Sequence, residues 1–360
     1  MAKVLCAMSG GVDSSVAAYL LKEAGHDVVG IFLRLGPDAA SHHRGSRRAC
    51  CSIEDSRDAA LVASRLEIPY YSLNYEGEFG RVIDHFIEEY HRARTPNPCV
   101  LCNQWLKFGS LRARALALGC EAVATGHYAR IQRDPSGRPQ LLRGRDHAKD
   151  QSYFLFLMPR DSLHDTIFPV GSYTKAEIRA VAREAGLPVA EKAESQDICF
   201  VPDNDYREVL RARTPTRLEP GRFVDLSGRV LGHHEGYQSF TIGQRRGLGV
   251  AIGKPAYVNA IDPETNTVTL TDRESLRRTT MEVSQVQWTS IDSPMTGESI
   301  RVEAQIRHHH MPRAATVTVL EGDRAHVRFD EFEEAVKPGQ AAVFYAGEVL
   351  LGGGWIDSAT

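Results

Sequence analysis

The sequence contains no long hydrophobic run. Its uninterrupted apolar stretches fall far short of the roughly 18 residues that a membrane-spanning helix needs, so we expect no membrane protein. The first of them, Val4–Met8, is too short for the core of a signal peptide and is followed at once by a glycine-rich segment. We therefore expect a cytoplasmic protein. A hydrophobic fraction of 42% beside a charged fraction of 25% is ordinary for a globular protein and argues against intrinsic disorder.

The chain also lacks a large net charge and an even number of cysteines. The 43 Lys and Arg residues nearly balance the 46 Asp and Glu residues, and the net charge of −3 argues against a mainly electrostatic nucleic-acid binder. Such a sum can still conceal local patches. Seven cysteines, an odd number scattered along the chain, argue against a disulfide framework. Reactive or metal-binding thiols are therefore a better interpretation of these cysteines than disulfides.

The first two hundred residues show an alternating pattern of short apolar segments and helical periodicity. The segments 3–8, 27–33, 70–73 and 122–124 predict buried strands. Helices are predicted between them, at a segment beginning near Ser14, at one capped by Ser52, and at 78–91 and 103–118. Strands that alternate with helices of this length predict parallel βαβ units.

The pattern changes beyond about residue 205. Short alternating runs such as 300–306, 315–320 and 341–345 are separated by Gly, Pro and Asp turn signals, which predicts small β-barrels. We therefore predict an α/β plus all-β fold. It has a parallel-sheet domain over residues 1–204, a small β-rich central domain over residues 205–272 and a C-terminal β-barrel over residues 273–360.

The segment Ser9–Ser15 (SGGVDSS) lies between the first predicted strand and the first predicted helix. Its glycines let the backbone approach a ligand, the helix N-terminus directs N–H groups at anionic oxygens, and its serines add hydroxyl donors. This predicts a phosphate-binding loop, with a plain helix-starting turn as the alternative. The spacing fits neither the Walker loop nor the Rossmann fingerprint. It resembles the PP-loop of the ATP pyrophosphatase superfamily, which implies an enzyme that forms AMP from ATP.

A C-x-x-C pair follows two prolines at Cys99 and Cys102. Cys102 falls near the start of a helical pattern, where the helix dipole would favour the thiolate. Cys120 and Cys199 each stand alone, so a structural zinc site lacks its second ligand pair. Cys199, at the end of a polar run, is either a buried strand residue or a nucleophile. The remaining cysteines are predicted to be structural: Cys6, Cys50, Cys51 and Cys120.

Taken together, the motifs form an ordered set that resembles the tRNA-specific 2-thiouridylase family from residue 1 to about residue 356. Besides the loop, they are residues 95–103 with Lys107 and Phe108, residues 124–128, 149–155, 195–200, 241–245 and 338–340, and residues 351–354.

This resemblance implies an adenine nucleotide α-hydrolase-like first domain and a reaction on tRNA. ATP would adenylate the C2 oxygen of wobble uridine 34, a very poor leaving group, and persulfide sulfur would then replace it. The products would be 2-thiouridine, AMP and pyrophosphate. Cys199 matches the persulfide carrier and Cys102 the nucleophile that completes the exchange by forming a disulfide with it. The implied cofactors are ATP and Mg²⁺, and the implied partners are tRNAs for Lys, Glu and Gln and a cysteine desulfurase or sulfur-relay protein.

The resemblance also implies binding residues. Those matching ATP contacts are Ala7, Met8, Ser9, Gly10, Gly11, Val12, Asp13, Ser14, Leu33 and Gly126. Those matching the loop that receives the target base, which must leave its stack, are Asn97, Pro98 and Cys99. Those matching other tRNA contacts are His127, Lys149, Asp150, Gln151, Arg307, His308 and Gln340; the family usually has Tyr at the position of His308.

One position departs from a common form of the family, which has Asp where this chain has Cys99. A thiol is a weaker general base than a carboxylate. The substitution raises the hypothesis that Cys99, Cys102 and Cys199 hold an iron–sulfur cluster with one open iron site.

Charge is segregated along the chain. Residues 205–260 contain nine basic and five acidic residues, whereas residues 262–360 contain nine basic and sixteen acidic ones. A basic central region can neutralise tRNA phosphates while the acidic barrel faces elsewhere. Two alternatives stay open: another AMP-forming PP-loop ligase, which would need no cysteine pair, and an ATP-regulated RNA-binding protein without chemistry.

Overall fold

A computed structural model describes residues 1–36, 53–194, 198–250, 253 and 255–360. The predicted helix cap Ser52, the cysteines Cys50 and Cys51, and residues 195–197 of one family motif therefore lie outside the described residues.

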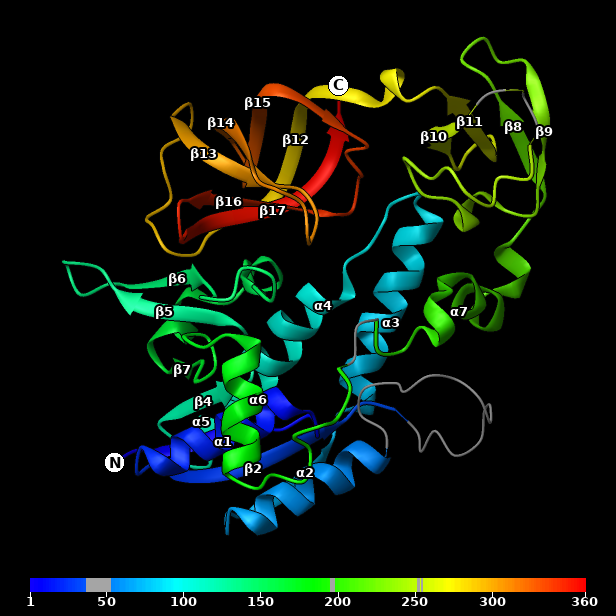
Figure 1. The fold of residues 1–360 in the computed structure, drawn as a ribbon. Helices are drawn as coiled ribbons and strands as arrows, with labels where there is room; N and C mark the ends of the chain where they lie inside the picture. The colour runs from blue at the N-terminus through cyan, green and yellow to red at the C-terminus, as the bar shows by residue number, and fades with distance from the viewer. Residues whose placement is uncertain (37–52, 195–197, 251–252, 254) are drawn as a thin grey trace.

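The first domain is built on a five-stranded sheet in the order β3-β2-β1-β4-β7, in which every neighbouring pair is parallel. This arrangement, visible in the lower half of Figure 1, confirms the α/β prediction. Its strands are β1 (Lys3–Ala7), β2 (Asp27–Arg34), β3 (Tyr70–Asn74), β4 (Ala122–Thr125) and β7 (Thr166–Ile167).

Helices cover both faces of this sheet. Because successive side chains of a strand point to opposite faces, Val4 and Cys6 join one core cluster and Leu5 joins another. The Val4 cluster includes residues of α1 (Val12–Glu23), α2 (Ile53–Arg65) and α6 (Lys175–Glu184). The Leu5 cluster includes residues of α3 (Glu76–His91) and of the helical stretch that follows it.

That helical stretch is continuous, but it consists of two α-helical parts with a π-helix between them. It begins as α4 (Pro98–Leu101), widens into a π-helix at Cys102–Leu111 and ends as α5 (Arg112–Ala117). The sequence predicts helix at 103–118, but apolar spacing does not distinguish a π-helix from an α-helix. Such widened turns are frequent at functional sites, and here the π-helix starts at Cys102.

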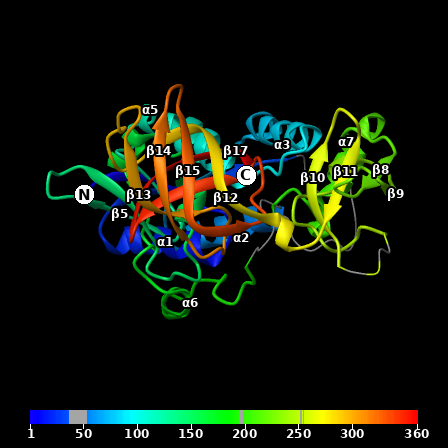
Figure 2. The same cartoon turned by 90° about the horizontal axis from the view of Figure 1, so that it is seen from above.

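The central region has a four-stranded sheet of its own, in the order β10-β11-β8-β9. In both views it stands to one side of the molecule (Figures 1 and 2). Before it, α7 (Tyr206–Arg213) packs back on α3, with the Tyr206 and Tyr90 rings stacked 4.2 Å apart between centroids. The strands are β8 (Gly221–Val224), β9 (Val230–His234), β10 (Tyr257–Asp262) and β11 (Thr267–Thr271).

The C-terminal region is a closed six-stranded barrel, as the sequence predicts. Pairing of β12 with β17 closes the ring β12-β15-β14-β13-β16-β17. Gly352 lies where the ring closes: a Cβ there would come within 2.3 Å of the Gln287 carbonyl oxygen, so this motif lets two strands approach. The strands are β12 (Arg277–Trp288), β13 (Ser299–Gln305), β14 (Arg313–Leu320), β15 (Arg324–Glu334), β16 (Ala341–Ala346) and β17 (Val349–Ala359).

The barrel and the first domain share a sheet. The hairpin of β5 (Ala129–Arg133) and β6 (Pro139–Arg143) belongs to the first domain in sequence, yet Leu142 pairs with Val349 of β17. The barrel therefore sits on the hairpin and above α4 (Figure 1). Within the described ranges, no helix has both the length and the apolar character needed to cross a bilayer. Short 3-10 turns occur at Ser152–Leu155, Arg160–His164, Pro202–Asn204, Pro215–Arg217, Tyr237–Ser239 and Glu274–Leu276.

Candidate active site

The predicted phosphate loop connects β1 to α1 and is held in one shape by its own hydrogen bonds. Ser14 Oγ accepts a hydrogen bond from Ser9 N at 3.0 Å and donates one to Gly11 O at 3.1 Å. Gly10 has a φ of +74°, and a Cβ there would lie 2.2 Å from the Asp55 carbonyl oxygen. Gly11 caps α1 without a side-chain hydrogen bond. The N-terminal N–H groups of α1 are thus presented to an anion by a loop that only glycine can form at residue 10.

The two other predicted ATP contacts lie at the same edge of the sheet. Gly126 follows β4, and a Cβ there would come within 2.6 Å of Ser14 N, so only glycine lets β4 approach the loop this closely. Leu33 lies near the carboxyl end of β2. The β1–β2 ladder ends at Ala7 and Ile31, with one further hydrogen bond from Met8 N to Ile31 O, so the Leu33 backbone extends beyond β1 and is paired only with β3 on its other side. Nucleotides bind at this carboxyl edge in open α/β sheets.

Charged side chains that no sequence motif indicates surround the loop. Lys175 Nζ donates to both carboxylate oxygens of Asp13, at 2.7 and 2.8 Å, and the Tyr128 hydroxyl donates to the same carboxylate at 2.8 Å. Lys192 Nζ donates to the Gly10 carbonyl oxygen at 3.0 Å and to Asp55 Oδ1 at 2.7 Å, and it also contacts Asp58. A lone lysine in a helical or loop pattern gives no signal of such a contact. These lysines fix the loop from the side of α6.

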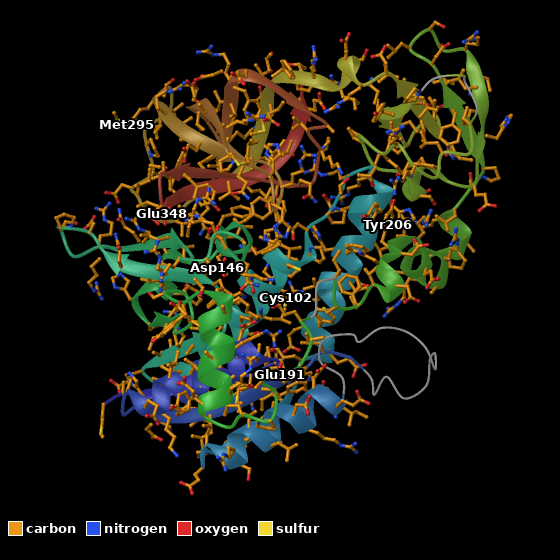
Figure 3. All side chains as sticks on the ribbon, in the orientation of Figure 1. Cys102, Asp146, Glu191, Tyr206, Met295 and Glu348 are labelled. Atoms are coloured by element: carbon orange, nitrogen blue, oxygen red, sulfur yellow. The ribbon has the colours of Figure 1, made fainter. Side chains whose placement is uncertain are left out.

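Cys102 and Cys199 meet the same core, although they are far apart in the sequence. Both are half-buried and pack against the Leu5 cluster, as does Ala7 at the base of the phosphate loop. Phe200 anchors the Cys199 segment on α3, with its ring 5.7 Å from that of Phe79 and 5.0 Å from that of Phe86. Cys102 lies between the barrel and the parallel sheet (Figure 3).

The other described cysteines behave as structural residues. Cys6 is fully buried in β1, and burial raises the pKa of its thiol to about 12, which keeps it protonated. Cys120 is buried as well. Within the described ranges, no three His, Cys, Asp or Glu side chains are grouped so that they could hold a metal ion. The hypothesis that Cys99, Cys102 and Cys199 ligate a cluster therefore finds no matching arrangement.

The predicted target-base loop is fastened by the barrel. Thr95 N donates to Pro338 O at 2.8 Å, and the Gln340 side-chain amide donates to Thr95 O at 3.0 Å and to Pro96 O at 3.2 Å. The buried Asn97 side chain hydrogen-bonds to the hydroxyl of Tyr153. Gln340, predicted to contact tRNA, thus holds the approach to Pro98 and Cys99 in place.

The predicted tRNA segment Lys149–Gln151 completes a tight turn that begins at Asp146, whose carbonyl oxygen accepts from Lys149 N at 2.9 Å. Asp150 is 8% exposed and accepts hydrogen bonds from Gly144 N, from Ser152 N and Oγ and from Arg143. Gln151 Oε1 accepts from Tyr128 N at 3.0 Å. Of these three residues, only Lys149 extends a charged group out of the turn, and its Nζ donates a hydrogen bond to Glu194 Oε2 at 2.7 Å. The side chains of Asp150 and Gln151 therefore shape this turn.

The remaining predicted tRNA contacts come from both domains. His308 Nε2 lies 3.2 Å from Asp150 O, and the His308 ring packs 4.4 Å from that of Phe154, which brings the Arg307–His308 turn of the barrel to the Lys149–Gln151 turn. His127 is 9% exposed and lies between Thr125 Oγ1 at 2.6 Å and Lys107 Nζ at 3.3 Å. Burial lowers the pKa of His127 well below its usual value, and the charge of Lys107 lowers it further, so this imidazole is neutral.

Comparison with known families agrees with this architecture. Three family models match successive parts of the chain: a tRNA methyl transferase HUP domain over residues 2–203, a tRNA methyl transferase PRC-barrel domain over residues 207–272 and an aminomethyltransferase β-barrel domain over residues 278–356. Fold and loop together define a PP-loop nucleotide-binding domain followed by two β domains.

Full-length relatives identify the family. A protein of Geobacter metallireducens described as tRNA-specific 2-thiouridylase MnmA is 49% identical over 360 residues, which cover 99% of this chain and 97% of its own. Proteins of the same description from Moorella thermoacetica and Chloroflexus aurantiacus are 48% and 49% identical, over 98% and 99% of this chain and 99% and 98% of their own. The chain belongs to the tRNA-specific 2-thiouridylase family.

Solved structures show more remote likenesses. A 4-thiouridine synthetase in complex with RNA and ATP is 16% identical, covers 59% of this chain and 50% of its own, and has a TM-score of 0.37. An NMN synthetase from Francisella tularensis is 17% identical, covers 54% of this chain and 66% of its own, and has a TM-score of 0.33.

Proposed function

We propose that this protein is a tRNA uridine 2-sulfurtransferase that converts uridine 34 to 2-thiouridine with ATP and persulfide sulfur. The observation that carries the proposal is that Cys102 and Cys199 pack against the same core cluster as Ala7, at the base of the phosphate loop. Membership of the 2-thiouridylase family supports it. Two family models carry the words methyl transferase, but a methyl transfer would use neither an ATP-cleaving loop nor a cysteine pair.

ATP would bind with its phosphates at the N-terminus of α1. Gly10 and Gly126 support this role because each lets backbone approach backbone, Gly10 against Asp55 and Gly126 against Ser14, which holds the loop in its shape at the start of α1. ATP supplies the AMP group that turns the uridine C2 oxygen into a leaving group. Mg²⁺ is proposed as the usual companion of the ATP phosphates. Because Asp13, the carboxylate of the loop, is already engaged by Lys175 and Tyr128, we assign Mg²⁺ no protein ligand and derive no step through it.

Sulfur would then be exchanged between the two cysteines. The terminal sulfur of a Cys199 persulfide attacks C2, a C–S bond forms, and the C2 oxygen leaves with AMP. The Cys102 thiolate next attacks Cys199 Sγ, which breaks the sulfur–sulfur bond to the base, releases 2-thiouridine and leaves a Cys102–Cys199 disulfide. A thiol reductant must open this disulfide before another turnover. Cys102 suits the attack because it is half-buried rather than fully enclosed, so its thiol can be reached, unlike that of the fully buried Cys6.

The partners follow from this chemistry. The target uridine would enter beside Asn97, Pro98 and Cys99, and tRNA phosphates would meet the basic residues between 205 and 260. The expected acceptors are the tRNAs for Lys, Glu and Gln. A cysteine desulfurase or a sulfur-relay protein would load Cys199.

The proposal is tested with the purified protein, ATP, Mg²⁺, a cysteine desulfurase with cysteine, and unmodified tRNA for Glu. Mass spectrometry of the nucleosides should show 2-thiouridine at position 34, and AMP and pyrophosphate should form only when tRNA is present. In tRNA labelled with oxygen-18 at O2 of uridine 34, the label should move into AMP. Unchanged uridine despite a working donor, or label that never enters AMP, contradicts the proposal.

Gln340→Ala is expected to lower the free energy of unfolding by about 1–2 kcal/mol, because two part-buried carbonyl groups lose their donor. The target-base loop loses its fastening, so kcat for tRNA should fall roughly tenfold. Chemical denaturation and steady-state kinetics measure the two effects. Gln132→Ala, at an exposed position of β5, is the control and should change neither. A direct tRNA contact alone would instead raise KM for tRNA and leave unfolding unchanged.

A further inference from the structure

The segment 190–194 forms a strap that fastens the approach to Cys199 onto the phosphate loop. The guanidinium of Arg179 donates to the carbonyl oxygens of Ala190 at 2.8 Å and Lys192 at 3.2 Å. Lys192 Nζ in turn donates to Gly10 O. Backbone and side chain of the strap are therefore both held, one by α6 and the other by the loop.

Glu194, the last residue of the strap, lies between two lysines. Its Oε1 is 3.0 Å from Lys175 Nζ, the group that also binds Asp13, and its Oε2 is 2.7 Å from Lys149 Nζ in the predicted tRNA turn. Arg179 lies 3.8 Å from the same carboxylate. A chain of charges thus runs from Asp13 through Lys175 and Glu194 to Lys149, linking the ATP loop to the tRNA turn.

The carboxylate of Glu194 is well suited to join these parts. Burial acts to raise the pKa of Glu194, but the hydrogen bonds from Lys149 and Lys175 outweigh it and hold the pKa below its usual value. The side chain of Lys175 is only 11% exposed, so this pairing is weakly screened by solvent. The N-terminus of α6 is also tied to the tRNA turn, because Asp146 Oδ2 accepts from Lys175 N at 2.9 Å.

The short length of chain between Glu194 and Cys199 limits how far apart these two residues can lie. Glu194 precedes Cys199 by five residues, and five residues span at most about 17 Å even when fully extended. On the other side, Phe200 is packed between Phe79 and Phe86 of α3. Cys199 is therefore bracketed by an anchor on the ATP loop and an anchor on the helix that precedes Cys102.

We propose that Glu194 is a positioning residue that couples adenylation to sulfur transfer, because one carboxylate ties the ATP loop, the tRNA turn and the approach to Cys199 together. The inference rests on the proposed function. An adenylated uridine exposed to water is lost by hydrolysis unless the persulfide is already in place. Keeping Cys199 within a short length of chain from the loop that forms the adenylate shortens the time before sulfur attacks.

The test is Glu194→Gln, which keeps the size of the side chain and removes its charge. In a reaction with ATP, Mg²⁺, a cysteine desulfurase with cysteine, and unmodified tRNA for Glu, we expect kcat for 2-thiouridine to fall roughly 10-fold to 100-fold. KM for ATP should change less than about threefold, because the phosphate loop itself is intact. The ratio of AMP to 2-thiouridine should rise from about one to above about five, because adenylate is wasted.

The matched control is Glu191→Gln in the same segment, where the exposed carboxylate forms an ion pair only with exposed Arg183 among the described residues. It should keep the wild-type rate and ratio. Thermal unfolding of Glu194→Gln should shift only slightly downward, because Lys175 keeps its two bonds to Asp13 and the amide oxygen can still accept a hydrogen bond. An unchanged ratio, or an equal loss of AMP and 2-thiouridine together with a large fall in unfolding temperature, would overturn the coupling role. A wild-type protein that forms no 2-thiouridine would defeat the proposed function and this inference with it.

Discussion

Cys199→Ser is expected to reduce 2-thiouridine formation at least about a thousandfold while tRNA-dependent release of AMP persists. A serine cannot carry a persulfide, so the adenylated uridine meets only water. Cys102→Ser should cause a loss of similar size for a different reason: sulfur reaches C2 but stays bound to Cys199. Without added thiol, that variant should accumulate tRNA attached covalently through Cys199.

Gel electrophoresis without reductant measures the adduct, and nucleoside mass spectrometry measures the product. The adduct of Cys102→Ser should dissociate on addition of dithiothreitol and yield 2-thiouridine, whereas Cys199→Ser should form none. Loss of activity in Cys102→Ser without any adduct contradicts the order of attack proposed here. Retention of full activity in Cys199→Ser would favour a PP-loop ligase that needs no cysteine pair.

Cys99→Asp is the informative control at the third cysteine. It installs the residue of a common family form, so activity should be kept. A catalyst that depended on three thiolates would instead lose its activity, together with any iron and acid-labile sulfide after anaerobic reconstitution.

The sequence predicts the layers of this fold well because they depend on local periodicity. The continuous apolar run Val4–Met8 records a strand buried on both faces, and the helical spacing of 78–91 records one buried face; the structure has a strand and a helix there. The hairpin of β5 and β6 could not be assigned to the barrel sheet in this way. Its pairing with β17 depends on contacts between residues some two hundred positions apart, which leave no periodic trace.

The candidate site residues also fall into two groups: those with a local signal in the sequence and those whose role depends on distant contacts. The sequence indicates the role of Ser9–Ser15 because glycine and serine at a strand–helix junction have few other uses. The sequence gives no such signal for Lys175 and Glu194, because a charged residue in a surface helix or loop is by default solvated. Lys175 is the first residue of α6, and the capping box of this helix, Thr174 with Glu177, is detectable from the sequence. That signal marks where the helix starts. It gives no information about the Lys175 side chain, which reaches Asp13.

Gly10→Ala is expected to destabilise the protein by about 2–5 kcal/mol. An alanine at a φ of +74° costs about 1–2 kcal/mol of backbone strain. The added Cβ would also lie 2.2 Å from the Asp55 carbonyl oxygen, and relieving that overlap in a packed region costs typically 1–3 kcal/mol. The way to relieve it is to move the loop away from α2, which also breaks the bond between Gly10 O and Lys192. The N–H groups of α1 then lose their alignment, so ATP affinity should fall at least roughly tenfold.

Gly80→Ala provides the matched control, because Gly80 lies inside α3 and a Cβ there meets nothing within 4 Å. That change should leave ATP affinity unaltered and stabilise the protein by up to about 1 kcal/mol, since alanine favours the helix. Denaturant unfolding gives the stability of both variants, and isothermal titration calorimetry gives their ATP affinity. If Gly10→Ala matched the wild type in both measurements, the loop would not be the close-packed phosphate site that its contact with Asp55 implies. If it lost stability but bound ATP normally, the glycine would serve the packing of α2 alone, and the adenylation proposed here would need another nucleotide site.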